Sequence, residues 1–210
     1  FYYRGGGNGY TNTMFWLRTG IGVMKFVHPD DTNRDEKEEY IRKKAEPAIR
    51  YAEILLIYAE ALNELTGNYN IASWDEETQY TIQRNIDEMK KGIQPIRIRA
   101  GIPDYTRSEY EDQDLFREKL KRERQIELMG EGHRYYDIRR WKDAEVEESL
   151  PIYGCNTLMT EKWRDVFHVP VAIPSLPTNF SRKMYFWPIS HSELKRNKML
   201  TQNPGWTYND

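Results

Sequence analysis

The stretch from Arg122 to Trp141 constrains the fold of this chain more than any other part of its sequence. It mixes charged residues of both signs with apolar ones, and Gly130 and Gly132 lie at its middle. Glycine is the usual residue where a helix ends in a left-handed turn, so the two glycines predict two helices around a tight joint. Its apolar residues are too dense for a solvated charge run: Ile126, Leu128, Tyr135, Tyr136, Ile138 and Trp141.

The spacing of charges within this stretch predicts ion pairs. Glu123 and Glu127 lie one helical turn apart, as do Asp137 and Arg140, so each can meet a partner on the same helix face. We interpret the stretch as a half-buried ionic network under aromatic cover that holds two helices together.

Length and composition exclude several classes of protein. The 210 residues suffice for one domain, or about one and a half, and a net charge of −2 argues against a nucleic-acid partner. Cys155 is the only cysteine, which excludes a disulfide framework and a thiolate zinc site. No apolar run reaches the length of a membrane span. Because the chain begins with Phe1 rather than Met, we expect it to be the C-terminal portion of a longer protein.

Residues 47–66 have the pattern of an amphipathic helix. Pro47 suits the first helical turn, and Gly67 suits the position just past a helix end. Apolar residues recur between them at intervals of three and four: Ala52, Leu55, Ala59 and Leu62, with Leu56 and Leu65 widening the stripe. We therefore predict a helix that begins at Pro47.

A second helix is predicted to follow, with Ser73 and Glu76 as its capping box and Gly92 at its end. Its apolar face consists of Ile82, Ile86 and Met89. The two helices make a tetratricopeptide-like hairpin, which needs partners elsewhere to bury its faces. Residues 92–103 are predicted to be a connector. A further capping box, Ser108 with Glu111, is predicted to open one long helix that leads into the 122–141 stretch.

The C-terminal third is irregular. Three prolines exclude a central strand and leave room only for short edge strands or a hairpin: Pro170, Pro174 and Pro177. Aromatic residues in this region are expected on exposed loops: Tyr153, Trp163 and Phe167. A short helix with Glu193 and Leu194 is predicted near the end.

Four segments resemble the SusD/RagB family. The most specific is the motif Glu-Gly-His-Arg-Tyr-Tyr-Asp-Ile-Arg-Arg-Trp, which ends at Trp141. Residues 49–61 resemble the family's Arg-Tyr-Ala-Glu-x-x-Leu-x-Tyr-Ala-Glu-Ala, and residues 96–103 its Arg-x-Arg-Ala-Gly-hydrophobic-Pro. Residues 184–206 are similar to its closing segment, with Gln-Asn-Pro-Gly-Trp at the end. A weaker match begins at Thr19, so the resemblance covers nearly the whole chain.

This resemblance implies a glycan-binding lipoprotein on the outer membrane of gut-type bacteria, without catalytic activity. It further implies a TonB-dependent, SusC-like transporter as partner, and membrane attachment only through a lipid anchor outside this chain. The expected fold is mostly α, with tetratricopeptide-like helical hairpins, long irregular loops and minor β structure. Within it we expect a loop-rich entry at 1–46, a helical core at 47–150, and loops with a closing segment at 151–210.

The residues themselves show no catalytic constellation. The four histidines are scattered, and we expect His133, which lies among arginines, to be hydrogen-bonded or ion-paired. Paired carboxylates are abundant, so a glycosidase stays open as an alternative, although first-turn charges and solvated faces explain them more simply. No cofactor and no metal site is predicted.

Aromatic residues are the predicted ligand-binding groups, because sugar rings stack their C–H faces on Trp and Tyr. The chain holds 15 Tyr and 6 Trp, a surplus over what a small core needs. The candidates are Tyr3, Tyr10 and Trp16 in the Gly-rich N-terminal segment, Trp163 in the late loop, and Trp74 in the first turn of the predicted second helix. We assign Trp141, Trp187 and Trp206 to structure. The alternative function is a tetratricopeptide-like scaffold that binds only protein partners.

Overall fold

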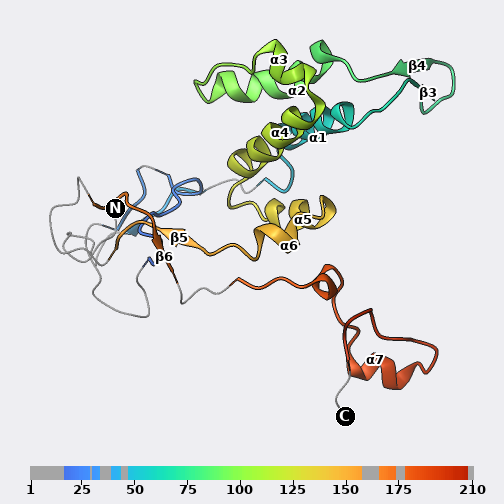
Figure 1. The fold of residues 1–210 in the computed structure, drawn as a ribbon. Helices are drawn as coiled ribbons and strands as arrows, with labels where there is room; N and C mark the ends of the chain where they lie inside the picture. Colours follow the sequence, from blue (N-terminus) through green and yellow to red (C-terminus); the bar gives the residue numbers. More distant parts are fainter. Residues whose placement is uncertain are drawn as a thin grey trace. The chain divides into compact units, whose positions relative to one another are not determined.

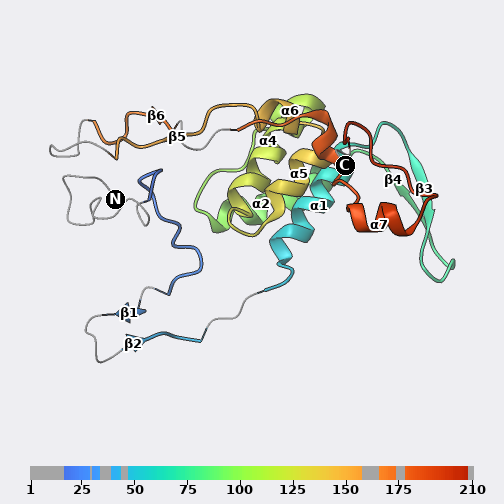
Figure 2. The same cartoon turned by 90° about the horizontal axis from the view of Figure 1, so that it is seen from below.

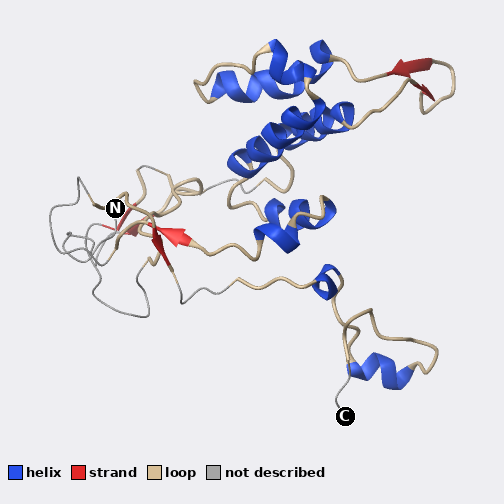
Figure 3. Ribbon diagram, viewed as in Figure 1, coloured by secondary structure: helices blue, strands red, loops and turns tan. Residues whose placement is uncertain are grey.

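The computed structural model describes residues 17–28, 30–33, 39–43, 47–157, 166–173 and 178–207. The fold is mostly helical, with three short antiparallel strand pairs among the described residues (Figure 3). The prediction of a mostly α fold is therefore confirmed. The chain divides into two compact units, Thr32–Arg134 and Phe1–Asp31 with Tyr135–Asp210, which we call the helical unit and the second unit.

The helical unit contains the larger of the two hydrophobic clusters found among the described residues, and Figure 1 labels its helices and its β3–β4 hairpin. Its described helices are α1 (Tyr51–Asn63), α2 (Ile86–Arg99), α3 (Arg107–Glu111) and α4 (Gln113–Glu127). Its strands are β1 (Thr32–Asn33), paired with β2 (Glu39–Tyr40), and β3 (Tyr69–Ala72), paired with β4 (Gln79–Ile82).

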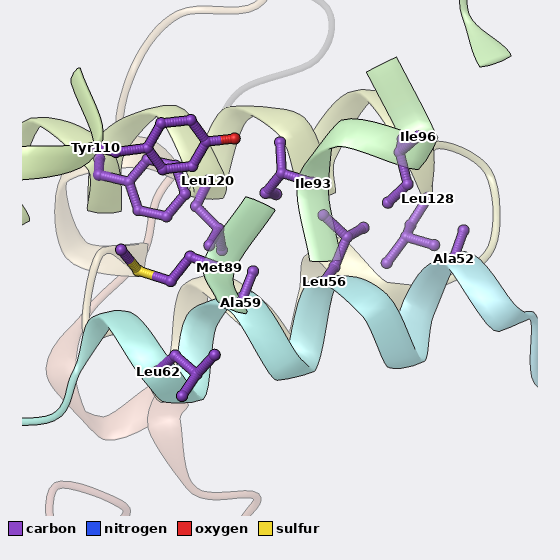
Figure 4. Packing of buried hydrophobic residues seen from close by; sticks show 11 residues of the cluster. Ala52, Leu56, Ala59, Leu62, Met89, Ile93, Ile96, Tyr110, Leu120 and Leu128 are labelled. Carbon is purple, nitrogen blue, oxygen red and sulfur yellow. The ribbon is translucent and has the colours of Figure 1, made fainter. Parts of the chain in front are cut away.

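The core of the helical unit lies where α1, α2 and α4 pack together (Figure 4). Its fully buried side chains come from all three helices and from the short α3: Leu56, Ala59, Met89, Ile93, Tyr110 and Phe116. Gly92 lets α1 and α2 approach closely. A Cβ atom at Gly92 would lie 2.5 Å from the carbonyl oxygen of Leu55 and 2.9 Å from Ala59 Cβ, distances that only glycine accommodates without a shift.

The predicted ionic network is present and joins three helices rather than two. Arg50, at the N-cap of α1, contacts Glu127 Oε1 at 2.9 Å through Nη1 and Glu131 Oε1 at 2.7 Å through Nη2. Glu127 also accepts a hydrogen bond of 2.5 Å from Arg99, at the end of α2. Burial alone raises the pKa of Glu127, but the hydrogen bonds from Arg99 and Arg50 outweigh burial and hold that pKa below its ordinary value.

A second ion pair of the 122–141 stretch lies under aromatic cover, as predicted. Arg97 donates to Glu123 Oε2 at 2.6 Å, and its guanidinium lies 3.8 Å from the ring centre of Tyr105. The Tyr105 hydroxyl donates to the same carboxylate oxygen at 2.9 Å. Burial and the negative charge of Glu123 raise the pKa of Tyr105, so the phenol stays a donor.

The joint between α4 and α5 (His133–Arg140) is also as predicted. Gly130 and Gly132 have φ angles of 80° and 82°, in the left-handed region that glycine adopts without strain. His133 Nδ1 lies 3.5 Å from Glu53 Oε1, in line with a histidine that pairs with a carboxylate. Arg140 Nη2 meets Asp137 Oδ1 at 2.8 Å.

Several predicted helix bounds were wrong. The first helix begins at Tyr51 rather than Pro47, because Arg50 is extended and its side chain binds the ionic network. It ends at Asn63, before Gly67. The long helix before Gly130 is interrupted at Asp112, which ends α3 and caps α4 by accepting from the Leu115 amide at 3.0 Å. The capping box that opens α3 is Thr106 with Glu109, two residues before the predicted pair Ser108 and Glu111.

The predicted second helix was wrong in its first part, which forms a β-hairpin. Residues 69–82 form the β3–β4 hairpin, and α2 begins only after Asn85, whose side chain accepts from the Glu88 amide at 3.1 Å. The helix then continues through Gly92 and Pro95 to Arg99, where a connector was expected. The buried side chains of Met89, Ile93 and Ile96 hold α2 together through this region, since tertiary packing outweighs local propensity.

The second unit contains α5, which the division between the units cuts after Arg134, and shorter elements. These are α6 (Ala144–Glu147), the paired strands β5 (Tyr153–Gly154) and β6 (Val171–Ala172), a 3-10 helix η1 (Arg182–Tyr185) and α7 (His191–Arg196). The short edge strands and the late helix are as predicted.

Two aromatic predictions in the second unit were wrong. Phe167 was expected on an exposed loop but is fully buried, because the tight turn at Gly20 lies against its ring. Trp187 was assigned to structure, yet its side chain is 77% exposed. Its backbone is engaged, because the Trp187 carbonyl accepts from Asn203 Nδ2 at 2.6 Å.

Candidate functional site: the β3–β4 hairpin

The β3–β4 hairpin extends away from the helices of the helical unit in both ribbon views (Figures 1 and 2). Tyr69 is opposite Ile82 and Ile71 is opposite Tyr80. Directly opposed residues of an antiparallel pair share a face, so the hairpin has one aromatic and aliphatic face. Its other face is small and polar, with Asn70 opposite Thr81 and Ala72 opposite Gln79. The Thr81 hydroxyl donates to Asn70 Oδ1 at 2.8 Å.

The turn of the hairpin presents Trp74 to solvent. Ser73 and Thr78 close the turn: the Ser73 amide donates to the Thr78 carbonyl at 2.7 Å, and the Thr78 amide donates to Ser73 Oγ at 3.0 Å. Glu76 has a φ of 62°, which completes the reversal. Trp74 is 95% exposed. An indole ring held outward on a bonded turn is available for stacking on a flat ligand.

A polar network fixes the base of the hairpin to the helices. Arg84, two residues after β4, donates to Asn63 Oδ1 at 3.2 Å from Nε and 3.0 Å from Nη2, and also to the Tyr110 carbonyl. Asn63 ends α1, and its Nδ2 donates to the Gln113 carbonyl at 3.1 Å. The hairpin is therefore anchored at its base and exposed at its tip. Such loops on a rigid scaffold commonly carry binding function.

The structure describes only one of the predicted ligand-binding residues. Tyr3, Tyr10, Trp16 and Trp163 lie outside the described residues. Trp74 is described, and it lies in the turn of a hairpin rather than in the first turn of a helix.

The prediction missed the aromatic residues on the strands next to Trp74. Tyr69 and Tyr80 are about half exposed and lie on the same face of the hairpin. A signal for them exists in the sequence: Tyr-x-Ile occurs at 69–71 and again at 80–82, around a turn-forming segment. Alternation of this kind is typical of a β-hairpin.

Neither a candidate metal site nor a membrane-spanning helix is present among the described residues. Among them, no three His, Cys, Asp or Glu side chains gather as a metal site would require. In the same part of the chain, no helix is long and apolar enough to span a membrane.

Comparison with known proteins identifies the family. A family model described as the SusD family matches residues 1–206. The chain belongs to the SusD family. Its tetratricopeptide-like helical hairpins agree with that membership.

Individual SusD-like proteins match the chain over part of their own length. The SusD-like protein P2 of Formosa agariphila is 31% identical over 162 residues, which make up 75% of this chain and 25% of that protein. Among solved structures, a SusD-like protein from Bacteroides fragilis is 28% identical with a TM-score of 0.55, over 76% of this chain and 25% of that one. The protein BT4246, in its selenomethionine form, is 25% identical with a TM-score of 0.60, over 78% of this chain and 25% of that one. The chain thus spans about a quarter of the length of these relatives.

Proposed function

We propose that this protein captures a polysaccharide or oligosaccharide at the outer cell surface and delivers it to a TonB-dependent outer-membrane transporter, without catalysis. Membership of the SusD family is the observation that carries the proposal. A lipid anchor outside this chain attaches the protein to the membrane.

Within the described residues, the ligand contact that we propose is Trp74 at the tip of the β3–β4 hairpin. Its indole is almost fully exposed, and the C–H face of a sugar ring can stack on it. Hydroxyl and amide side chains of the same hairpin, such as Thr78 and Gln79, can hydrogen-bond sugar hydroxyls. We propose Tyr3, Tyr10, Trp16 and Trp163 as further contacts of the same kind, because they are aromatic residues of segments rich in loop-forming residues.

Calorimetric titration tests this function. The folded chain is titrated with soluble polysaccharides and oligosaccharides, and the titration is repeated with Trp74→Ala and Trp16→Ala. Because stacking on an aromatic ring contributes about 0.5–1.5 kcal/mol beyond area burial, each variant should weaken binding to one glycan class by about tenfold or less. The same samples should release no shorter oligosaccharide. Absence of binding to every glycan by the folded chain contradicts the proposal.

One observation favours the alternative of a scaffold for protein partners. On α1 the face opposite the core is apolar and exposed, with Tyr51, Ile54 and Tyr58 at intervals of three and four residues. A helix that is apolar on two faces suits burial between two neighbours. A chain that only binds proteins should have no measurable glycan affinity. Trp74→Ala should then leave the titration with glycans unchanged.

A further inference from the structure

The charge of the β3–β4 hairpin is entirely negative. From Leu65 to Gln83, a segment that the structure describes throughout, the sequence contains no Lys, Arg or His. Its only charged residues are Asp75, Glu76 and Glu77, which directly follow Trp74. All three carboxylates are exposed. Because these three residues follow Trp74 without a gap, a ligand stacked on Trp74 lies in the negative field of the same turn.

Hydrogen bonds within the turn fix the first of these carboxylates, Asp75. The Ser73 hydroxyl and the Glu77 amide both donate to Asp75 Oδ1, the latter at 3.2 Å. The hydrogen bond from Ser73 lowers the pKa of Asp75, so this group stays ionised at neutral pH. Glu76 occupies the left-handed position of the turn, and Glu77 follows it as an exposed residue of the same turn.

The rest of the segment offers only neutral polar groups. Its hydroxyl and amide side chains are Thr66, Asn68, Asn70, Ser73, Thr78, Gln79, Thr81 and Gln83. Such groups pair with the hydroxyls of an uncharged sugar. Sulfate and carboxylate groups are instead bound by Arg and Lys, whose charge-assisted hydrogen bonds are about twice as strong as neutral ones. The segment lacks those residues.

We infer that the hairpin selects uncharged glycans, and that Glu76 and Glu77 are specificity-determining residues that exclude sulfated and uronic-acid polysaccharides from Trp74. This inference rests on the proposed function, since it names the class of glycan that the same site takes. Like charges placed close together weaken the binding of a wrong partner, and they add little to the affinity for the right one.

A matched pair of ligands tests the inference. The neutral probes are dextran, laminarin, mannan and xyloglucan, and each neutral polysaccharide that binds is compared with its own sulfated derivative. In about 0.01 M salt, where the Debye length is about 30 Å, the sulfated form should bind at least about tenfold more weakly. In about 1 M salt, where the Debye length falls to about 3 Å, the difference should largely disappear.

Two variants assign the effect to residues. Glu76→Gln with Glu77→Gln should strengthen binding of the sulfated form severalfold at low salt and leave the neutral form unchanged. Asp75 is kept, because it bonds the turn. As a control, Asp87→Asn with Glu118→Gln removes an equal number of negative charges, one from α2 and one from α4, and should change neither affinity.

The outcomes separate this inference from the proposed function. A sulfated or uronic-acid polysaccharide that binds at least as well as the neutral one, and loses affinity with Trp74→Ala, overturns the inference and keeps the function. The inference is also overturned if the variant with Glu76→Gln and Glu77→Gln binds the sulfated form as weakly as the unaltered protein does. Neutral binding that Trp74→Ala does not affect shows that the hairpin is not the site. No binding to any polysaccharide overturns both.

Discussion

The core of the helical unit and the β3–β4 hairpin lie in the same unit but use their aromatic residues in opposite ways. Phe116 and Tyr110 are fully buried where α1, α2 and α4 meet. Trp74, on the hairpin, is 95% exposed, and Tyr69 and Tyr80 are half exposed. Burial of apolar area stabilises a fold, whereas an exposed ring contributes little to stability and remains available to a ligand. From this difference we propose that the helices provide stability and that the hairpin binds the ligand.

The sharpest test of this difference compares one aromatic residue from each region. Phe116→Ala should destabilise the fold by about 3–5 kcal/mol, because it removes a buried ring and leaves a cavity. Trp74→Ala, as the matched control, should change stability by no more than about 0.5 kcal/mol. Denaturant titration measures both. Equal losses in the two variants would mean that the hairpin belongs to the core.

The ionic network is the next largest expected contribution on the helical side. Glu127→Ala should destabilise the fold by about 2–4 kcal/mol, because it leaves Arg50 half-paired in a largely buried site. Arg50 retains Glu131, and Arg99 is more exposed than Arg50, so the loss should fall short of that for a fully buried pair. Denaturant titration again gives the value. A change in the free energy of unfolding within measurement error would show that these ion pairs do not stabilise the fold.

Close packing of α1 on α2 is expected to contribute less. Gly92→Ala should destabilise the fold by about 1–3 kcal/mol, since its Cβ would press on the Leu55 carbonyl and on Ala59. Gly67→Ala is the matched control, because a Cβ there meets no atom within 4 Å. Thermal unfolding of the two variants checks the prediction, and stabilisation by Gly92→Ala would rule out the close crossing.

Acid should weaken the helical unit by a smaller and gradual amount. The pKa of Glu127 lies below its ordinary value of 4.5. The stability that this carboxylate contributes is therefore fully present above pH 4.5 and lost as the pH falls through the lowered value. Unfolding free energies measured from pH 6 to pH 2 should fall, and Glu127→Gln should flatten that fall. Identical pH profiles for the two proteins would remove Glu127 from the acid response.

Features that depend on helical periodicity were predicted correctly from the sequence. The segment in which a helical pattern and a strand pattern compete was not. Glu123 and Glu127, one turn apart beside two glycines, were enough to predict an ionic network and a joint between helices. For residues 69–82, the helical spacing of Ile82, Ile86 and Met89 and the apparent capping box at Ser73 suggested a helix. The β-forming alternation of Tyr and Ile prevailed, because the Ser73 hydroxyl bonds the turn rather than a helix end.

The candidate site was harder to predict than the fold. Trp74 was named as a ligand-binding residue, but its exposure follows from a hairpin that was not predicted. Phe167 and Trp187 show the same limit in the second unit, since the first was expected to be exposed and is buried, and the second was assigned to structure and is exposed. Whether an aromatic residue in an irregular segment packs inward depends on distant contacts, such as those at Gly20, which local pattern does not encode.

Amide hydrogen exchange with and without a bound polysaccharide tests the division of roles most directly. The account predicts slow exchange in α1, α2 and α4 that the ligand does not alter, and faster exchange in residues 69–82 that slows when the ligand binds. Residues 69–82 as protected as α1 in the ligand-free protein, or unchanged by a ligand that slows exchange elsewhere, would contradict the assignment of binding to the hairpin.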